Sequence, residues 1–330
     1  MVQRWRADVV LSPNGRYLAY RFGGGDLVVC SVADGKVLGR APTRLTDDVG
    51  AVSDDGRYVI LIDWGEGPGV VVSFPFPPPA QTVTLVDLET GSRTVPAVIA
   101  DLVTDRTHGD YWVNGVVWLS ADDAFLLDIP GTTGPPAHTN TQETYLYDPA
   151  KDSLTKVSGL DELGSSAVSR DGGVLGRVRV QSSSGEDQSD ESQPVVWQAG
   201  TSPGFAFDPS WPGGPGAISP DGSVVMLGVG GMPGTFPAWQ AFRRVDNEWR
   251  PSSQAWPFSS RSTQSSPMYV GADDRTAWGA AYEPLSADPT RQHSYLVSLD
   301  TVTGTRTEWF RLIDLKVAPE EFDILQVIFP

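Results

Sequence analysis

The sequence predicts an all-β protein, a β-propeller built from four-stranded antiparallel blades. The first observation is a small-residue turn, Ser-x-Asp-Gly, that occurs about six times between apolar β-runs. The second is its spacing, since a repeat of about 50 residues made of short strands and tight turns is typical of propellers. The third is a composition with 35 glycines and 27 prolines and no extended helical periodicity. The acidic or amide position of the turn falls at Asn14, Asp55, Asp122, Asp171, Asp221 and Asp273, at intervals of 41, 67, 49, 50 and 52 residues.

Each repeat is interpreted as one blade with strands A to D, in which the Ser-x-Asp-Gly turn joins A to B. Residues 322–329 read as one further buried strand, so six blades are favoured and seven are possible, all within a single domain, 1–330. The expected strands, blade by blade, are 4–12, 16–22, 26–32 and 36–41; 50–53, 57–64, 82–88 and 92–99; 111–120, 124–129, 143–147 and 153–158; 167–169, 174–181, 194–198 and 204–207; 217–219, 223–229, 238–245 and 248–251; 267–271, 276–282, 294–299 and 306–313.

The repeated turn has a physical reason. The serine bonds locally, the aspartate or asparagine accepts backbone N–H groups in an Asx-turn, and the glycine supplies the positive φ that closes it. We therefore expect these turns to be structural. Each offers one or two carboxylates, whereas Ca²⁺ requires six or more oxygen ligands. No metal and no cofactor is expected.

The formal net charge of −17, without any Lys/Arg cluster, excludes nucleic acid as a partner, because phosphate backbones require a basic surface. No apolar run approaches transmembrane length, so no membrane insertion is expected in this chain. The single cysteine, Cys30, leaves no intramolecular disulfide. Residues 1–8 do not resemble a signal peptide, which leaves two alternatives: a cytoplasmic protein, or an exported one whose signal has been removed.

The turns Ser-Pro-Asn-Gly at 12–15 and Ser-Pro-Asp-Gly at 219–222, with their flanking β-runs, resemble the repeats of TolB-like propellers. These repeats are also called WD40-like, and prolyl oligopeptidase propellers contain them. The resemblance implies an extracytoplasmic bacterial scaffold that contacts partner proteins, and it favours that compartment over the cytoplasm. Two positions depart from the pattern, Gly271 in place of serine and Asp123 in place of glycine. No Gly-x-Ser-x-Gly elbow is found, so a peptidase would lack its nucleophile.

The lengths of the connections differ between the two ends of the predicted blades. The A–B and C–D turns are short, and the B–C and D–A connections carry nearly all the extra length. We call the end that bears these connections the long-loop end. Its insertions are 65–81, 130–142, 182–192, 232–237 and 283–292 between B and C, and 100–110, 208–215 and 254–266 between D and A. Such insertions either form a recognition surface or reflect drift in unconstrained loops, and both interpretations stay open.

Aromatic residues and histidines in these connections are the candidate binding residues. Exposed aromatic clusters mark interfaces, and tryptophans stack on sugars or peptides. His108 and Asp110 are also candidates for acid–base chemistry, but no His-x-His or His-x-x-x-His spacing suggests a metal site. The full set of candidates is Trp64, Phe74, Phe76, His108, Asp110, Trp112, His138, Trp211, Phe236, Trp239, Trp256, Phe258 and His293.

These observations predict a non-catalytic binding or scaffolding propeller that recognises a protein, peptide or glycan through its long-loop end. The alternative is a propeller enzyme, a lyase or hydrolase with a funnel site at the same end. A convergent pair of titratable groups with perturbed pKa values would favour the enzyme. An open, aromatic and uncharged rim would favour the binding protein.

Overall fold

The computed structural model describes sixteen stretches of the chain. By contacts the chain divides into two compact units, 1–166 together with Pro330 and 167–329. The described stretches are 9–21, 25–44, 46–63, 81–104, 110–132, 140–169, 172–179, 192–198, 205–207, 215–229, 238–246, 248–252, 256–257, 264–271, 273–285 and 288–311.

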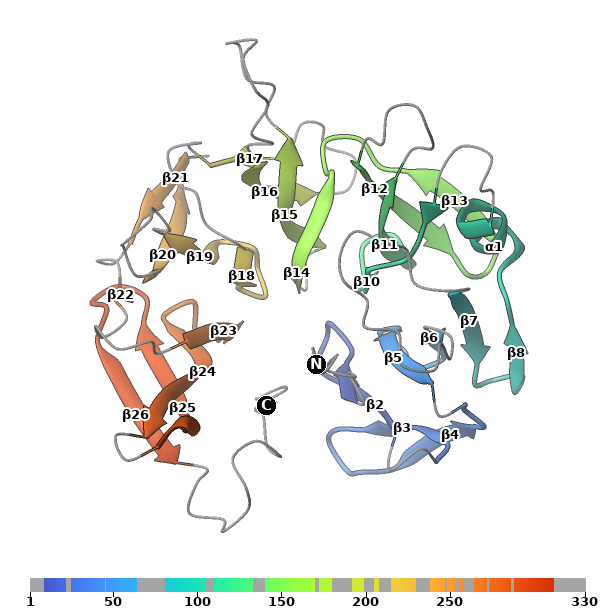
Figure 1. Cartoon of the computed structure of the whole chain (residues 1–330), viewed down its shortest axis with the longest axis horizontal. Helices are drawn as coiled ribbons and strands as arrows, with labels where there is room; N and C mark the ends of the chain where they lie inside the picture. The colour runs from blue at the N-terminus through green and yellow to red at the C-terminus, as the bar shows by residue number, and fades with distance from the viewer. Residues whose placement is uncertain are drawn as a thin grey trace. The chain divides into compact units, whose positions relative to one another are not determined.

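The first unit contains three antiparallel sheets, each a meander in chain order (Figure 1). Strand β9 (Asp110–Tyr111) joins the third sheet by pairing with β11, which makes that sheet five-stranded. The other strands are β1 (Val9–Leu11), β2 (Tyr17–Arg21), β3 (Leu27–Ser31) and β4 (Val37–Ala41); β5 (Asp47–Val52), β6 (Tyr58–Asp63), β7 (Thr82–Asp87) and β8 (Ser92–Thr94); β10 (Gly115–Leu119), β11 (Ala124–Thr132), β12 (Asn140–Asp148) and β13 (Ser153–Lys156).

Three further antiparallel sheets follow the same meander, and the boundary between the units falls within the first strand of this group. Here β22 (Trp256–Pro257) is the extra strand and pairs with β20. The others are β14 (Glu162–Val168), β15 (Gly173–Arg179), β16 (Ser192–Gln198) and β17 (Phe205–Ala206); β18 (Pro215–Ile218), β19 (Val224–Val229), β20 (Ala238–Val245) and β21 (Glu248–Pro251); β23 (Gln264–Val270), β24 (Thr276–Leu285), β25 (Asp288–Asp300) and β26 (Arg306–Arg311). The expectation of uniformly four-stranded sheets is therefore corrected in two of them.

The repeated turns have the predicted chemistry. In the second sheet, Ser53 Oγ donates to Asp55 Oδ1 at 2.5 Å, and the same oxygen accepts the backbone N–H of Arg57 at 2.9 Å. Gly56 closes this turn with a φ of 74°. Where glycine is absent, an aspartate adopts the left-handed conformation instead, with φ of 48° at Asp123 and 54° at Asp274. Aspartate tolerates this region better than most residues, which explains how the turn survives the substitution.

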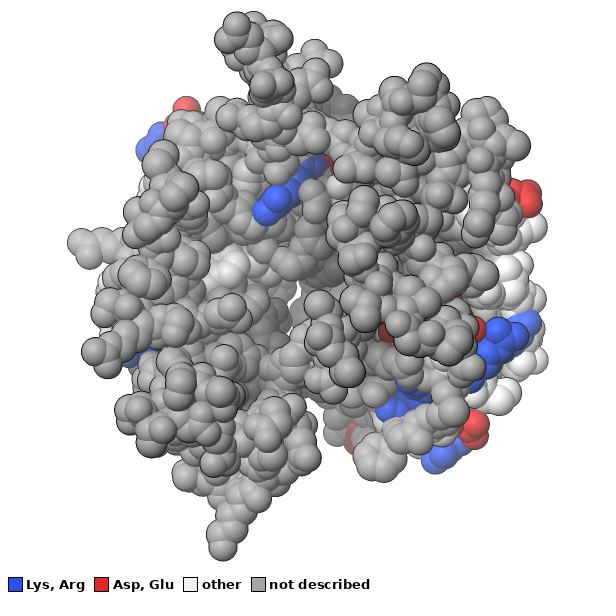
Figure 2. Space-filling model, viewed as in Figure 1, with Lys and Arg blue, Asp and Glu red and all other residues white. Residues whose placement is uncertain are grey.

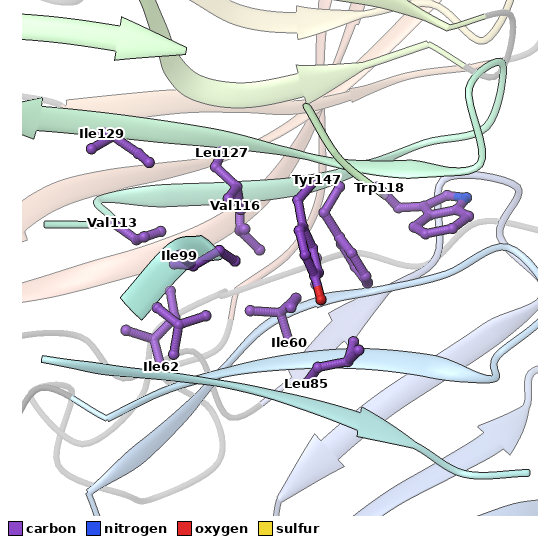
Figure 3. Close-up of a cluster of buried hydrophobic side chains, with 13 residues drawn as sticks. Ile60, Ile62, Leu85, Ile99, Val113, Val116, Trp118, Leu127, Ile129 and Tyr147 are labelled. Atoms are coloured by element: carbon purple, nitrogen blue, oxygen red, sulfur yellow. The ribbon is translucent and has the colours of Figure 1, made fainter. Parts of the chain in front are cut away.

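The core of the first unit lies between successive sheets. Side chains of the second and third sheets interleave in one buried cluster, which Figure 3 shows with Ile60 and Leu85 facing Val116 and Leu127. Residue Trp118 is 5% exposed in this cluster, and its ring meets that of Phe125 edge-on at 4.8 Å. A second cluster, which includes Leu61 and Val29, joins the first and second sheets. These contacts hold the three sheets together within one unit.

The one helix among the described residues, α1 (Ala97–Thr104), corrects the expected D strand 92–99 and the link 100–110. Strand β8 ends at Thr94, and the chain then turns at Pro96, whose carbonyl oxygen accepts the N–H groups of Ile99 and Ala100. Proline favours the first turn of a helix because it has no N–H to satisfy. Ile99 is fully buried and Leu102, three residues later, packs against the same cluster, so one face of the helix closes the core.

Two of the expected loops are also corrected. Strands β11 and β12 continue their pairing to Thr132 and Asn140, well inside the expected insertion 130–142. Strands β24 and β25 pair as far as Leu285 and Asp288, with a register shift after Pro284, where the sequence suggested the loop 283–292. Both hairpins are longer than expected because polar and proline residues, which are typical of loops, lie here in paired strands, and the register shift after Pro284 accommodates one of the prolines.

Candidate binding site at the long-loop end of the first unit

The long-loop end of the third sheet is a defined structure. Strand β9 lies in the connection that enters this sheet, yet it pairs with the far end of the B–C hairpin, Tyr111 opposite Gly131 and Asp110 opposite Thr132. The D–A and B–C connections of this sheet therefore meet at one end, as the sequence predicts. In the second unit, β22 lies in the connection that leaves its sheet and pairs with the third strand, β20, with Trp256 opposite Trp239.

The candidate residues differ in what the structure shows of them. Of the two with described side chains, Trp112 is half-buried just after β9, and Trp239 is half-buried in β20. Asp110, Trp256 and His293 lie in β9, β22 and β25, and only their backbone is described. His293 pairs with Glu283 in a strand, so its expected loop position was wrong. The candidates outside the described residues are Trp64, Phe74, Phe76, His108, His138, Trp211, Phe236 and Phe258.

Trp239 does not occupy the exposed position expected of a rim aromatic. Its side chain packs against a buried cluster of the second unit that includes Met226 and Ala241. This contact explains why an aromatic residue is retained there without reference to a ligand. The pairing of β22 beside it nevertheless brings two predicted site residues, Trp239 and Trp256, to neighbouring positions on adjacent strands.

Trp112 lies in a short break between β9 and β10 that is held from both sides. Its backbone N–H donates to the carbonyl oxygen of Pro130 at 3.2 Å, and the N–H of Asn114 donates to that of Asp128 at 2.8 Å. Between them, the Gln81 side chain pairs with the backbone of Val113: its Nε2 donates to the carbonyl oxygen and its Oε1 accepts the N–H, both at 2.7 Å. The segment 112–114 is therefore fixed, and the Trp112 ring is presented from a rigid backbone.

The Tyr111 ring covers the hairpin beside this segment. A Cβ atom on Gly131 would lie 2.3 Å from Tyr111 Cδ1, so only glycine allows the ring to pack there. Nearby, Glu143 accepts hydrogen bonds from the Tyr145 hydroxyl and the Lys156 ammonium group. Burial opposes ionisation of Glu143, but these two donors outweigh it and lower its pKa below the ordinary value. Burial, followed by the hydrogen bond to Glu143, raises the pKa of Tyr145.

A second group of polar residues, which we call the arginine–aspartate cluster, joins the connection between the first and second sheets to strands β2, β6 and β8. It consists of Arg21, Arg44, Asp47, Asp63 and Arg93. The two carboxylates face each other across β5 and β6, where Asp47 pairs with Asp63. Their separation from bulk water is nearly complete, since Asp47 is 0% and Asp63 7% exposed. Buried carboxylates of this kind require compensating donors.

The donors to the carboxylates come from Arg44 and Arg93, and Arg21 binds the Arg44 backbone. Asp47 Oδ2 accepts the Arg44 backbone N–H at 2.7 Å and Arg93 Nη2 at 2.8 Å. Asp63 Oδ2 accepts Arg44 Nη1 at 3.1 Å. The backbone carbonyl of Arg44 accepts Arg21 Nη1 at 2.6 Å. Figure 2 shows basic side chains in blue beside acidic ones in red over the part of the first unit where strands β3 to β8 lie in Figure 1.

This arrangement is suited to recognition more than to proton transfer. Both buried carboxylates of the cluster accept hydrogen bonds from guanidinium groups, and Asp47 Oδ2 also accepts a backbone N–H, so these oxygens already serve the fold. Within the described stretches no group of three His, Cys, Asp or Glu side chains could hold a metal ion. The same residues contain no helix long and apolar enough to cross a membrane.

Sequence reasoning missed the cluster and the Gln81 tether. Arg93 and Asp47 are 46 residues apart, and Gln81 and Val113 are 32 apart, so no local pattern links them. One signal was available. Strand β5 begins with Asp47 and β6 ends with Asp63, and extending the predicted strand 50–53 by three residues toward the N-terminus would have placed the two carboxylates opposite each other. Such a like-charged pair requires nearby cations.

No protein-family model and no curated protein matches the chain. Among solved structures, the chain is similar to the β-propeller domain of the Trilobed protease from Pyrococcus furiosus, at 13% identity over 92% of this chain and 82% of that one, with a TM-score of 0.52. It is also similar to Porphyromonas gingivalis dipeptidyl peptidase 4, at 10% identity over 95% of this chain and 46% of that one, with a TM-score of 0.52. A third similar structure is Pyrococcus horikoshii acylaminoacyl peptidase, at 10% identity over 92% of this chain and 45% of that one, with a TM-score of 0.52. The chain spans less than half the length of these two peptidases. Similarity at this level of identity shows the fold, a β-propeller.

Proposed function

We propose that the chain is a non-catalytic binding or scaffolding propeller that recognises a protein, peptide or glycan through its long-loop end. The observation that carries the proposal is the fixed backbone of the segment 112–114, which holds the Trp112 ring beside the third sheet. Rigid aromatic side chains supply contact area at low entropic cost, and pre-organisation favours affinity.

The alternative, a lyase or hydrolase, stays a prediction. The neighbouring solved structures include peptidases, but their similarity to this chain extends to the fold alone. At the long-loop end of the first unit, the buried carboxylates Asp47 and Asp63 are bonded to arginines. The use of both groups in structural ion pairs favours the binding function over acid–base chemistry.

We further propose that the repeats are of the TolB-like type and that residues 1–330 act as one domain in an extracytoplasmic compartment. Support comes from the turn chemistry, which matches the expected repeat in the sheet that begins with β1 and in the sheet that begins with β18. Cell fractionation of the native host tests the compartment. Recovery of the protein wholly in the cytoplasmic fraction would contradict this part of the proposal.

Screening with defined libraries tests the binding function. The purified chain is offered a phage-displayed library of random dodecapeptides and a glycan array, and each enriched ligand is then titrated against Trp112→Ala and Val302→Ala. Val302 is 51% exposed in a short C–D turn, at the opposite end of its sheet, and serves as the control. We expect Trp112→Ala alone to weaken binding, by about tenfold or more, because an aromatic anchor contributes at least 1.4 kcal/mol. Equal binding by both variants, or no ligand from either library, would refute the proposal.

A further inference from the structure

We propose that Arg44 is the anchor for a carboxylate group of the partner, so that the ligand of the long-loop end is an acidic peptide segment. This inference rests on the proposed function and specifies the partner's chemistry. It follows from the different roles of the three arginines in the arginine–aspartate cluster, from the rigidity of the Arg44 backbone, and from the exposure of its guanidinium group.

Two of the three arginines are used by the fold itself. Arg93 donates through Nη1 to the carbonyl oxygen of Pro42 at 2.7 Å and through Nη2 to Asp47 at 2.8 Å, so both ends of its guanidinium group are bonded. Arg21 is 5% exposed and bonds to the Arg44 backbone. Neither side chain is free to turn toward a partner. Their effect is to hold the connection between the first and second sheets.

Arg44 differs because its backbone is fixed while its side chain is exposed. Its N–H donates to the fully buried Asp47, and its carbonyl oxygen accepts bonds from Arg21 Nη1 at 2.6 Å and from the Asp47 N–H at 3.1 Å. The side chain is 66% exposed. The position of the Cα atom is thus set by buried polar groups, and the guanidinium group extends from that point to the surface.

The guanidinium group of Arg44 has donors to spare. An arginine carries five N–H donors, and among the described residues one of them is used, on Asp63 Oδ2 at 3.1 Å. Asp63 orients the group from one side, and the remaining donors form the planar fork that binds a carboxylate through two parallel hydrogen bonds. A carboxylate is therefore the chemical group that fits, and in a peptide it comes from aspartate, glutamate or the C-terminus.

The Arg44 side chain is two-thirds exposed, whereas the Asp63 side chain that it contacts is 9% exposed. Substitution of Arg44 by glutamine removes the fork and leaves the buried bonds of its backbone in place, but it also takes a donor from a buried carboxylate. Urea unfolding of Arg44→Gln is therefore measured beside its binding, so that a loss of folding is distinguished from a loss of the fork.

The test uses the random dodecapeptide library already described. Enriched peptides are synthesised together with versions in which each acidic residue is replaced by its amide, and both are titrated against the wild type, Arg44→Gln and Arg250→Gln. Arg250 is the control because its side chain is 57% exposed and paired with an exposed carboxylate, Glu248, at 2.9 Å. We expect acidic peptides to be enriched, and Arg44→Gln to weaken their binding about tenfold, as expected for the loss of a charge-assisted pair. Removing the peptide's acidic group should have the same effect and should add nothing in the Arg44→Gln variant.

The outcomes separate this inference from the proposed function. Peptides without acidic residues, or acidic peptides that bind Arg44→Gln and the wild type equally, overturn the inference; if the same peptides lose affinity for Trp112→Ala, the binding function still holds. Ligands found on the glycan array alone overturn the inference and leave the function in place. The absence of any ligand overturns both.

Discussion

Replacing Asp47 by alanine tests whether the arginine–aspartate cluster holds the first unit together. Asp47 is fully buried and accepts two hydrogen bonds, one from Arg93 Nη2 and one from the Arg44 backbone. A hydrogen bond to a charged group contributes about 1.5–3 kcal/mol and a neutral donor about 1 kcal/mol. The Arg93 side chain is 27% exposed, so part of its charge is recovered by water. We therefore expect Asp47→Ala to lower the free energy of unfolding by about 3 kcal/mol, which is at the lower end of the range for breaking a buried ion pair.

The measurement is urea unfolding at neutral pH, followed by tryptophan fluorescence and by far-UV circular dichroism, with hydrogen exchange at β5 to locate the effect. Glu248→Ala is the matched control, because it removes a carboxylate from an exposed ion pair and should cost less than about 1 kcal/mol. The double variant Asp47→Ala/Arg93→Ala should be less destabilised than the sum of the single variants, since the two side chains act as a pair. If Asp47→Ala unfolds at the same urea concentration as Glu248→Ala, the cluster does not carry the stability assigned to it.

Two further predictions concern other parts of the fold. Burial and the neighbouring charge of Asp221 raise the pKa of Asp274. The protonated form of Asp274 is therefore stabilised in the folded protein. This stabilisation is complete at a pH below the pKa of Asp274 in the unfolded chain, and it is lost as the pH rises through its pKa in the folded protein. Asp274→Asn should therefore raise the urea midpoint at pH 7, and this gain should disappear near pH 4. Asp246→Asn is the control, because Asp246 has a similar positive φ, and it should change the midpoint little. Equal effects of the two substitutions would contradict the interaction between Asp274 and Asp221. Gly131→Ala places a Cβ atom against the Tyr111 ring and should abolish the exchange protection of β9. Unchanged protection at Tyr111 would show that the ring is free to move aside.

The repeated turn could be predicted from the sequence because its determinants are local. Ser53, Asp55 and Gly56 lie within four residues, and their hydrogen bonds and positive φ follow from residue type. The strands beside each turn follow from the same signal, since the turn fixes where A ends and B begins. The extra strand β9 and the helix α1 could not be found in this way, because pairing partners and a buried face decide them rather than local preference.

The candidate site was predicted only in outline. The sequence placed the connections at one end of each sheet and identified Trp112, but it treated Trp239 as exposed when packing against Met226 half-buries it. It gave no indication of Arg44, whose role depends on bonds to residues in other strands. Aromatic residues near a strand end can serve either a core or a surface, and only the packing of neighbouring sheets distinguishes the two.

The Gln81 tether has a consequence for how this fold can change. An amide side chain here replaces a strand as the hydrogen-bonding partner of Val113, so both of these bonds between the second and third sheets depend on one side chain and not on a ladder of main-chain bonds. Its substitution would remove the two bonds, while those of Trp112 and Asn114 to β11 would stay in place. The entry into the third sheet would then be held by β11 alone, with every β-pairing register preserved.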